Sequence, residues 1–378
     1  MSAGGSKALP AGWRLVRLGD VADRCLGKML DAQKNKGRPF PYLRNPNVRW
    51  FEVDTTDLQV MPFEDHELDR FGLREGDVVI CEGGEAGRAA IWDGRLPGVK
   101  FQKAIHRVRP GPELCNRYLV HRLMVDYHNG SLADYYTGAT IKHLTGQDLA
   151  RYEFPLPPLP EQKRIAAILD KADELRAKRR AALAELDTLV QSIFLEMFGD
   201  PATNPKGWRK APLGELIKLK SGNFLPASEM AERGGYPVLG GNGVNGYHDQ
   251  FMFEEPQIVI GRVGAYCGCV HVSPPMSWVT DNALYISDRD DSVDFGYLAF
   301  ALTYANLNQY ASQSGQPLIS GSRVYPVDIL VPSLPEQREF NGRARAVKKL
   351  LLSHQDSLGM LDALFSSLQD RAFRGELP

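Results

Sequence analysis

Cys267, Cys269 and His271 occupy alternate positions of the stretch CGCVH, and thiolate and imidazole are ligands that zinc prefers. Alternate residues of a strand share one face, so these three side chains could converge on one ion. A structural zinc site needs four ligands, usually supplied as two pairs, and no second pair with suitable spacing follows. The residues therefore do not predict a metal centre, and we expect no metal in this chain.

Two further stretches resemble nucleotide chemistry but lack essential residues. The run RNPNVRW begins at Arg44, whereas an enzyme that methylates a flipped adenine needs Asn-Pro-Pro-aromatic, and the second proline is absent. The run LGGNGVNG begins at Leu239, but neither Lys-Ser/Thr nor a later acid for ribose follows it, so it predicts a solvent loop. No GKS or GKT is present for ATP. The sequence thus predicts no catalytic residue and no cofactor bound by this chain.

Basic, amide and aromatic side chains are interleaved between Lys28 and Arg49, where Asp31 is the only acid. Lysine and arginine bind phosphates, while asparagine can contact base edges, so the mixture is typical of a DNA-binding loop. The alternative is an ordinary solvated loop. The candidate DNA contacts in this stretch are Lys34, Lys36, Arg38, Tyr42, Arg44, Asn45 and Asn47.

Further polar candidates lie beyond this stretch in both halves of the chain. Those of the first half are Gln102, Lys103, Lys142 and His143, the last two of which follow the turn TGAT. Those of the second half are Lys218, Lys220, Asn223, Arg262, Tyr266, Asn282, Gln313, Gln316 and Arg323. Two patches, one in each half, are predicted.

Composition limits the classes of protein that the chain can form. Its 378 residues carry 45 Lys and Arg against 46 Asp and Glu, a net charge of −1, so any DNA-binding surface must be local. No apolar run approaches the roughly 18 residues of a membrane span, and the N-terminus lacks a signal-peptide core. Scattered cysteines predict no disulfide framework and a reducing cytoplasm; they are Cys25, Cys81, Cys115, Cys267 and Cys269.

The chain contains an internal repeat. GWRLVRLGDV at Gly12 returns as GWRKAPLGEL at Gly207, and VVICEGGEAG at Val78 is echoed by IVIGRVGAYC at Ile258. The phrase LPEQ also occurs twice, 175 positions apart. Because these similarities keep the same order, they predict a duplication in which each half is a globular unit followed by a helix.

Each LPEQ begins a long stretch with apolar residues at a spacing of three and four, which predicts a helix that ends near Gly199 or Gly375. The matching stripes predict an antiparallel two-helix coiled coil, with polar Arg179 and His354 meeting at its middle. The alternative is two amphipathic helices, each packed on its own domain. The apolar seam residues are Ile165, Leu169, Ala172, Leu186 and Val190 in the first helix, and Phe340, Val347, Leu361 and Phe365 in the second.

The globular halves combine short β-branched runs bounded by Gly or Pro with a few helical segments, which predicts mixed α+β domains. The predicted fold is α+β, a pseudo-two-fold repeat of two such domains separated by two long antiparallel helices. The boundaries are residues 1–158 for the first domain, 159–200 for the central helix, 201–333 for the second domain and 334–378 for the C-terminal helix.

This arrangement resembles the DNA-specificity subunit of Type I restriction-modification systems. The first long helix resembles the central conserved region of that family, and AFRGEL at Ala372 resembles its C-terminal ending. GWRLVRLGDV and GWRKAPLGEL are similar to the openings of its target-recognition domains, and TGATIKHL and GQPLIS to the turns before each long helix. The second helix departs from the pattern at Gly342.

The resemblance implies a non-catalytic chain. Each target-recognition domain would read one half of a bipartite, asymmetric site in double-stranded DNA. Two adenine-N6 methyltransferase subunits and two endonuclease/translocase subunits would be its partners, and these would use S-adenosylmethionine, ATP and Mg²⁺. The alternative function is a coiled-coil scaffold without DNA readout.

Overall fold

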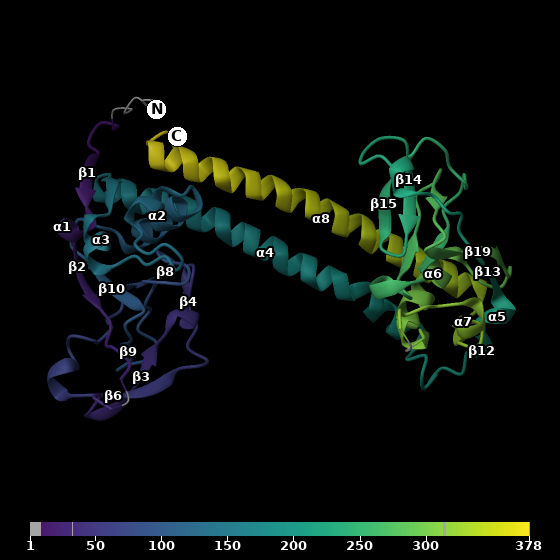
Figure 1. The fold of residues 1–378 in the computed structure, drawn as a ribbon, viewed down its shortest axis with the longest axis horizontal. Coiled ribbons are helices and arrows are strands. Elements are labelled where there is room, and N and C mark those ends of the chain that lie inside the picture. Colours follow the sequence, from purple (N-terminus) through teal and green to yellow (C-terminus); the bar gives the residue numbers. More distant parts are fainter. Residues whose placement is uncertain (1–8, 32, 313–314, 378) are drawn as a thin grey trace. The chain divides into compact units, whose positions relative to one another are not determined.

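The computed structural model describes residues 9–31, 33–312 and 315–377. The chain divides into two units. Unit 1 runs up to Arg179 and resumes at Ser357, while unit 2 is Arg180–Asp356. Each unit therefore contains one globular part and one end of each long helix, α4 (Leu159–Phe198) and α8 (Leu334–Arg374) (Figure 1).

Unit 1 is an α+β unit with three small sheets and a hairpin. The main sheet has the order β2-β10-β7-β8, a second sheet has the order β6-β3-β9, and β1 pairs with β11. All pairings are antiparallel except that of β3 with β9. Its other elements are β1 (Arg14–Arg17), α1 (Leu18–Val21), β2 (Ala22–Leu26), β3 (Arg38–Leu43), β4 (Val48–Arg49), β5 (Glu52–Val53), β6 (Gln59–Phe63), β7 (Val78–Cys81), β8 (Ala89–Ile91), β9 (Lys100–Phe101), β10 (Ile105–Pro110), α2 (Asn116–His128), α3 (Gly146–Arg151) and β11 (Glu153–Leu156).

Unit 2 repeats this topology. Its sheets have the orders β13-β19-β16-β17, β15-β14-β18 and β12-β20, and the pair β14-β18 is again the parallel one. Among the described residues of unit 2, the β4–β5 hairpin of unit 1 has no counterpart. The other elements are β12 (Arg209–Pro212), α5 (Leu213–Leu216), β13 (Ile217–Ser221), β14 (Tyr236–Gly240), β15 (Gly243–His248), β16 (Ile258–Gly261), β17 (Val270–Val272), β18 (Trp278–Val279), β19 (Ala283–Arg289), α6 (Phe295–Tyr304), α7 (Gly321–Val324) and β20 (Asp328–Val331).

The wholly apolar strands β7 and β16 are buried because both faces of their sheets are covered. Side chains alternate across a strand, so Val78 and Ile80 enter the large core of unit 1, while Val79 enters its smaller core. In β16, Ile260 enters the large core and Val259 the smaller one. This shared arrangement confirms the duplication and the α+β fold class.

The long helices run antiparallel within each unit. In unit 1 the beginning of α4, with Ile165 and Leu169, shares a core with Phe365 and Phe373 near the end of α8. In unit 2 the end of α4 meets the beginning of α8, where the rings of Phe194 and Phe340 lie 5.6 Å apart. Both helices end before a glycine in the left-handed region, as helix C-termini often do. The same cores also include residues of the globular parts. The helices therefore pack both on each other and on the globular parts, so both alternatives apply.

Most predicted seam residues are buried, but the predicted apolar stripe of α4 did not include all of its buried residues. Phe194 and Phe198 are 1% and 0% exposed and form an aromatic cluster with Phe340 and Tyr297. Both phenylalanines contact residues of α6, and neither belongs to the predicted seam. The buried seam residues are Ile165, Leu169, Ala172, Leu186, Phe340, Val347 and Phe365, while Val190 and Leu361 are half-buried.

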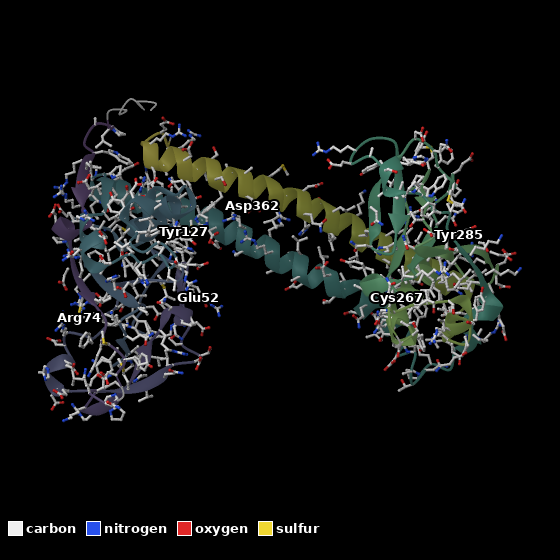
Figure 2. All side chains as sticks on the ribbon, in the orientation of Figure 1. Glu52, Arg74, Tyr127, Cys267, Tyr285 and Asp362 are labelled. Carbon is white, nitrogen blue, oxygen red and sulfur yellow. The ribbon has the colours of Figure 1, made fainter. Side chains whose placement is uncertain are left out.

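A polar contact that the sequence analysis did not predict lies in the unit 1 end of the helix pair. Arg176 donates to Asp362 on α8 at 2.6 Å, and its guanidinium lies 4.3 Å from the centre of the Phe365 ring (Asp362 is labelled in Figure 2). Arg179 and His354 are each half-buried, and the Nδ1 atom of His354 is buried without a hydrogen-bond partner among the described residues. Their pairing stays a prediction.

Helix α2 is tied to α4 by a charged cluster around Asp170. His121 and Arg117 each contact this carboxylate at 2.7 Å. Burial lowers the pKa of His121, which is therefore neutral near pH 7. Burial works to raise the pKa of Asp170, but the hydrogen bonds from His121 and Arg117 outweigh it and lower that pKa. The carboxylate thus stays ionised and orients both side chains of α2.

The glutamine of each LPEQ explains why the phrase is repeated. The amide of Gln162 accepts from the N–H of Cys115 and donates to the carbonyls of Glu113 and Pro157, each at 2.8 Å. The Gln162 side chain is completely buried. A carboxylate could accept but not donate, so glutamine is the residue that satisfies all three backbone groups.

Gln337 makes the same three bonds in unit 2. It accepts from Asp294 N–H at 2.7 Å and donates to the carbonyls of Ser292 and Pro332 at 2.9 and 2.8 Å. Each long helix thus begins at a fixed position on its globular part.

We expect Gln162→Ala and Gln337→Ala each to lower the free energy of unfolding by about 2–4 kcal/mol, because each removes the three hydrogen bonds of a fully buried amide. Urea unfolding measures the loss. Lys163→Ala, at the exposed neighbouring position, is the control and should change stability by less than about 0.5 kcal/mol. A loss for the glutamine variants no larger than that of the control would contradict the anchoring role.

Gly342 interrupts α8 at a position where an added Cβ would meet nothing within 4 Å, and Gly359 is the same. We expect Gly342→Ala and Gly359→Ala each to raise the free energy of unfolding by about 0.5–1 kcal/mol, because alanine loses less backbone entropy than glycine in a helix. Thermal unfolding is the measurement. Destabilisation would show that the helix needs flexibility at these glycines.

Candidate nucleic-acid interface

Four loops of unit 1 meet beside the carboxyl end of β7. The Asn45 side chain donates to the carbonyl of Gly83 at 2.9 Å, and Gly83 also forms a β-bridge with His143. The N–H of Glu82 donates to Ala104 at 2.8 Å. Backbone bonds therefore bring together the predicted residues near positions 45, 103 and 143, although they are far apart in the sequence.

The predicted residues of unit 1 differ in how freely they could contact a ligand. Lys36, Lys103, Lys142 and His143 are exposed, and Gln102 is half-buried. Lys34 pairs with Asp31 at 3.5 Å, Arg38 with Asp65 at 2.8 Å, and Arg44 with Asp57 at 2.7 Å. The pairs of Lys34 and Arg38 lie at the surface, where solvent weakens them, so a phosphate could compete for these two cations, whereas the Arg44 side chain is only 19% exposed.

Two predicted DNA contacts, Tyr42 and Asn47, have buried side chains. They are 2% and 3% exposed, because β3 places Tyr42 in the smaller core and its hydroxyl donates to Gln59 at 3.2 Å. The Asn47 side chain accepts from Arg44 N–H at 2.8 Å and donates to the carbonyls of Asp54 and Asp57. Asn47 therefore holds the loop that carries Arg44.

Arg262 is the centre of the equivalent loops in unit 2. Its N–H donates to the carbonyl of Asn282 at 3.0 Å, its carbonyl accepts from Ile319 at 2.9 Å, and its guanidinium donates to Ser221 Oγ at 3.1 Å. The loop at Val263 bridges Leu318 as that at Gly83 bridges His143. The frame of backbone bonds is thus the same in both units, while its side chains differ.

The remaining candidates of unit 2 differ in exposure. Lys220, Asn223, Asn282 and Gln316 are exposed, and Tyr266 is 48% exposed. Lys218 pairs with Asp288 at 2.8 Å, and Arg323 lies 3.5 Å from the carbonyl of Tyr310. Gln313 lies outside the described residues.

Two glycines allow the loops after β2 and β13 to lie in close contact with the facing loops. A Cβ on Gly27 would lie 2.1 Å from the carbonyl oxygen of Gln102, and one on Gly222 would lie 2.3 Å from that of Val279. Any other residue would have to push the loop away, so these glycines hold the loops after β2 and β13 against the patch.

The residues of CGCVH take structural roles. The thiol of Cys267 donates to the carbonyl of Arg262 at 3.3 Å, and burial raises the pKa of this thiol, which disfavours the thiolate that a metal needs (Figure 2). A ring nitrogen of His271 lies 3.2 Å from the carbonyl of Gly241, and Cys269 is exposed. Within the described ranges, no group of three His, Cys, Asp or Glu is placed to hold a metal, and no helix is long and apolar enough to cross a membrane.

Two units of one topology, each with a polar patch on a rigid loop frame, define a duplicated binding protein. The family model described as Type I restriction modification DNA specificity domain matches residues 10–185 and 205–340. The chain belongs to this family, which confirms the resemblance seen in the sequence.

Curated relatives agree with this assignment. The chain is 32% identical over 196 residues to the Type I restriction enzyme EcoprrI specificity subunit of Escherichia coli, and the match spans 48% of each protein. It is 21% identical to the putative type I restriction enzyme MjaX specificity subunit of Methanocaldococcus jannaschii, over 91% of this chain and 88% of the relative.

Solved structures share the fold. The Type I restriction-modification S subunit from M. genitalium superposes with a TM-score of 0.64 at 17% identity, over 99% of this chain and 98% of that one. A chain from a structure that describes complex assembly and conformational transition of the type I R-M system gives 0.62 at 23% identity, over 98% and 100%.

We expect Gly27→Ala and Gly222→Ala to destabilise their units by about 1–3 kcal/mol, because the new methyl group overlaps a backbone carbonyl that cannot rotate away. Calorimetric unfolding measures the loss. Gly342→Ala, where the methyl group meets open space, is the matched substitution with the opposite expected sign. Equal effects of all three variants would mean that close loop approach is not what requires glycine at positions 27 and 222.

Proposed function

We propose that each unit reads one half of a bipartite, asymmetric site in double-stranded DNA. The observation that carries this proposal is the equivalent loop frame with different side chains. By their shared backbone pairings, Asn282 of unit 2 takes the place of Ala104 in unit 1, and Leu318 takes the place of His143. Asparagine and histidine can form hydrogen bonds with DNA, whereas alanine and leucine side chains cannot, so one frame would recognise two different sequences.

The other parts of the complex follow from family membership and belong to the same proposal. The chain would be non-catalytic and would bind no cofactor of its own. It would dock two adenine-N6 methyltransferase subunits and two endonuclease/translocase subunits. S-adenosylmethionine, ATP and Mg²⁺ would be bound by those partners.

A scaffold that binds proteins but not DNA is the competing function. Two polar patches on conformationally fixed loops favour DNA readout, because a scaffold has no need of them. A gel-shift experiment with the purified methyltransferase partner separates the two functions, since a scaffold gives no sequence-specific shift.

A domain exchange tests independent readout. We expect replacement of residues 12–155 by the equivalent domain of a relative to change only one half of the methylated sequence in cells that also express the methyltransferase partner. The exchange leaves Pro157 and Gln162 in place, and the other two bonds of Gln162 go to backbone groups, so a domain of the same fold can restore them.

Exchange of Arg209–Val331 is the matched variant and should change only the other half. Methylome sequencing reads both outcomes. A swap that altered both halves would contradict one half-site per unit. Label transfer to DNA by the chain without its partner would contradict the non-catalytic role.

A further inference from the structure

Both units expose a large apolar side chain at the same place in the repeat. Met29 is 57% exposed and Phe224 is 72% exposed. Each is the third residue after a five-residue strand, β2 or β13, and follows the closely packed glycine by two positions. A single exposed apolar side chain is ordinary on a protein surface. Here such side chains lie at equivalent positions of both units beside the predicted DNA contacts, which indicates a common function.

The main chain under these residues is held in place. Lys28 donates its N–H to the carbonyl of Phe101 at 3.1 Å and accepts at 2.7 Å from the N–H of Lys103. In unit 2, Asn223 N–H donates to Val279 at 2.9 Å, and its carbonyl accepts from the Trp278 ring N–H at 3.3 Å. The next residue in each unit is therefore presented from a fixed backbone next to predicted DNA contacts.

The surroundings of Met29 suit an anionic ligand with apolar groups. Met29 lines a hollow of about 480 Å³ together with Lys34, Arg70 and Lys103. The acids in this hollow are already paired, Asp31 with Lys34 and Glu67 with the buried Lys28. A duplex offers phosphates to the cations and base edges to the methionine.

Phe224 lines a hollow of about 720 Å³ that is less basic. Trp278, His248 and Arg233 also line it, as do the acids Glu229 and Asp249. Charge therefore favours DNA less here, and the contact made by Phe224 must depend more on its apolar ring. Arg262, on the neighbouring loop, provides the cation that a phosphate would need.

We propose that Met29 and Phe224 are specificity-determining residues, each of which packs on a thymine methyl group in the half-site that its unit reads. The thymine methyl is the apolar group that a base pair presents in the major groove, and apolar side chains recognise it. This inference rests on the proposed function, because it needs each unit to meet its own half-site. It adds an apolar contact to a surface otherwise predicted to read DNA by charge and hydrogen bonds.

The test uses the full chain with its methyltransferase partner, and duplexes that carry the site found by methylome sequencing. In one set, each thymine in turn is replaced by uracil, which removes only the methyl group. An adenine methylation site contains A·T pairs, so such a series can always be made.

We expect Met29→Ala and Phe224→Ala each to weaken binding to the thymine duplex by about 5- to 100-fold, with non-specific binding unchanged. Replacement of one particular thymine of the corresponding half-site by uracil should weaken binding of the unsubstituted protein by a similar factor. The same uracil substitution should not change binding of the alanine variant, because the contact with the methyl group is already absent. Phe224→Leu should retain part of the affinity and of the uracil effect.

Val60→Ala and Met276→Ala are matched controls, since these residues are 61% and 45% exposed but line neither of the two hollows. They should bind as the unsubstituted protein does. An alanine variant that binds normally, or that loses affinity without losing its response to uracil, would overturn the inference. Absence of any sequence-specific binding by the unsubstituted complex would instead contradict the proposed function.

Discussion

The buried amides of Gln162 and Gln337 position everything else in this fold. Each amide is itself fully buried and closes three hydrogen bonds to backbone groups, so replacement of the glutamine would remove one partner from all three. Through these bonds the first turn of a long helix is joined to the loop before α2 or α6 and to the end of β11 or β20. These bonds therefore set the orientation of each long helix on its globular part.

The patches depend on a different constraint, the close approach of loop backbones. Gly27 and Gly222 let the loops after β2 and β13 contact the carbonyls of the facing loops. The bonds that hold these loops are mainly between backbone groups, which every residue type supplies. Surface side chains can therefore change without loss of the frame.

The two ends of the helix pair are stabilised differently although the repeat is clear. Unit 1 combines the Arg176–Asp362 ion pair with the Phe365 ring, whereas unit 2 packs Phe194, Phe198 and Phe340 around Tyr297. The aromatic cluster extends into α6, so in unit 2 the helices and the globular part share one core. One aromatic contact is common to both ends, since the ring of Tyr118 packs on Phe373 in unit 1 as that of Tyr297 packs on Phe198 in unit 2.

The sequence by itself determined the duplication, both long helices, the α+β class and the family. These properties follow from local hydrophobic periodicity and from repeated sequence motifs. Both can be recognised without knowing which segments of the chain are in contact. It also determined that polar residues gather in loops, but it could not tell Tyr42 and Asn47, which are buried, from Lys103 and His143, which are exposed.

Only the tertiary structure decided these differences, because burial depends on what a distant segment places against a side chain. Phe194 is in the core because α6 covers it, and the glutamine of LPEQ is buried because backbone groups about 45 residues away face it. The exposure of Met29 and Phe224 has the same origin. Their backbones are fixed by strands far along the chain, and the contacts that fix them leave no neighbour to cover the side chains.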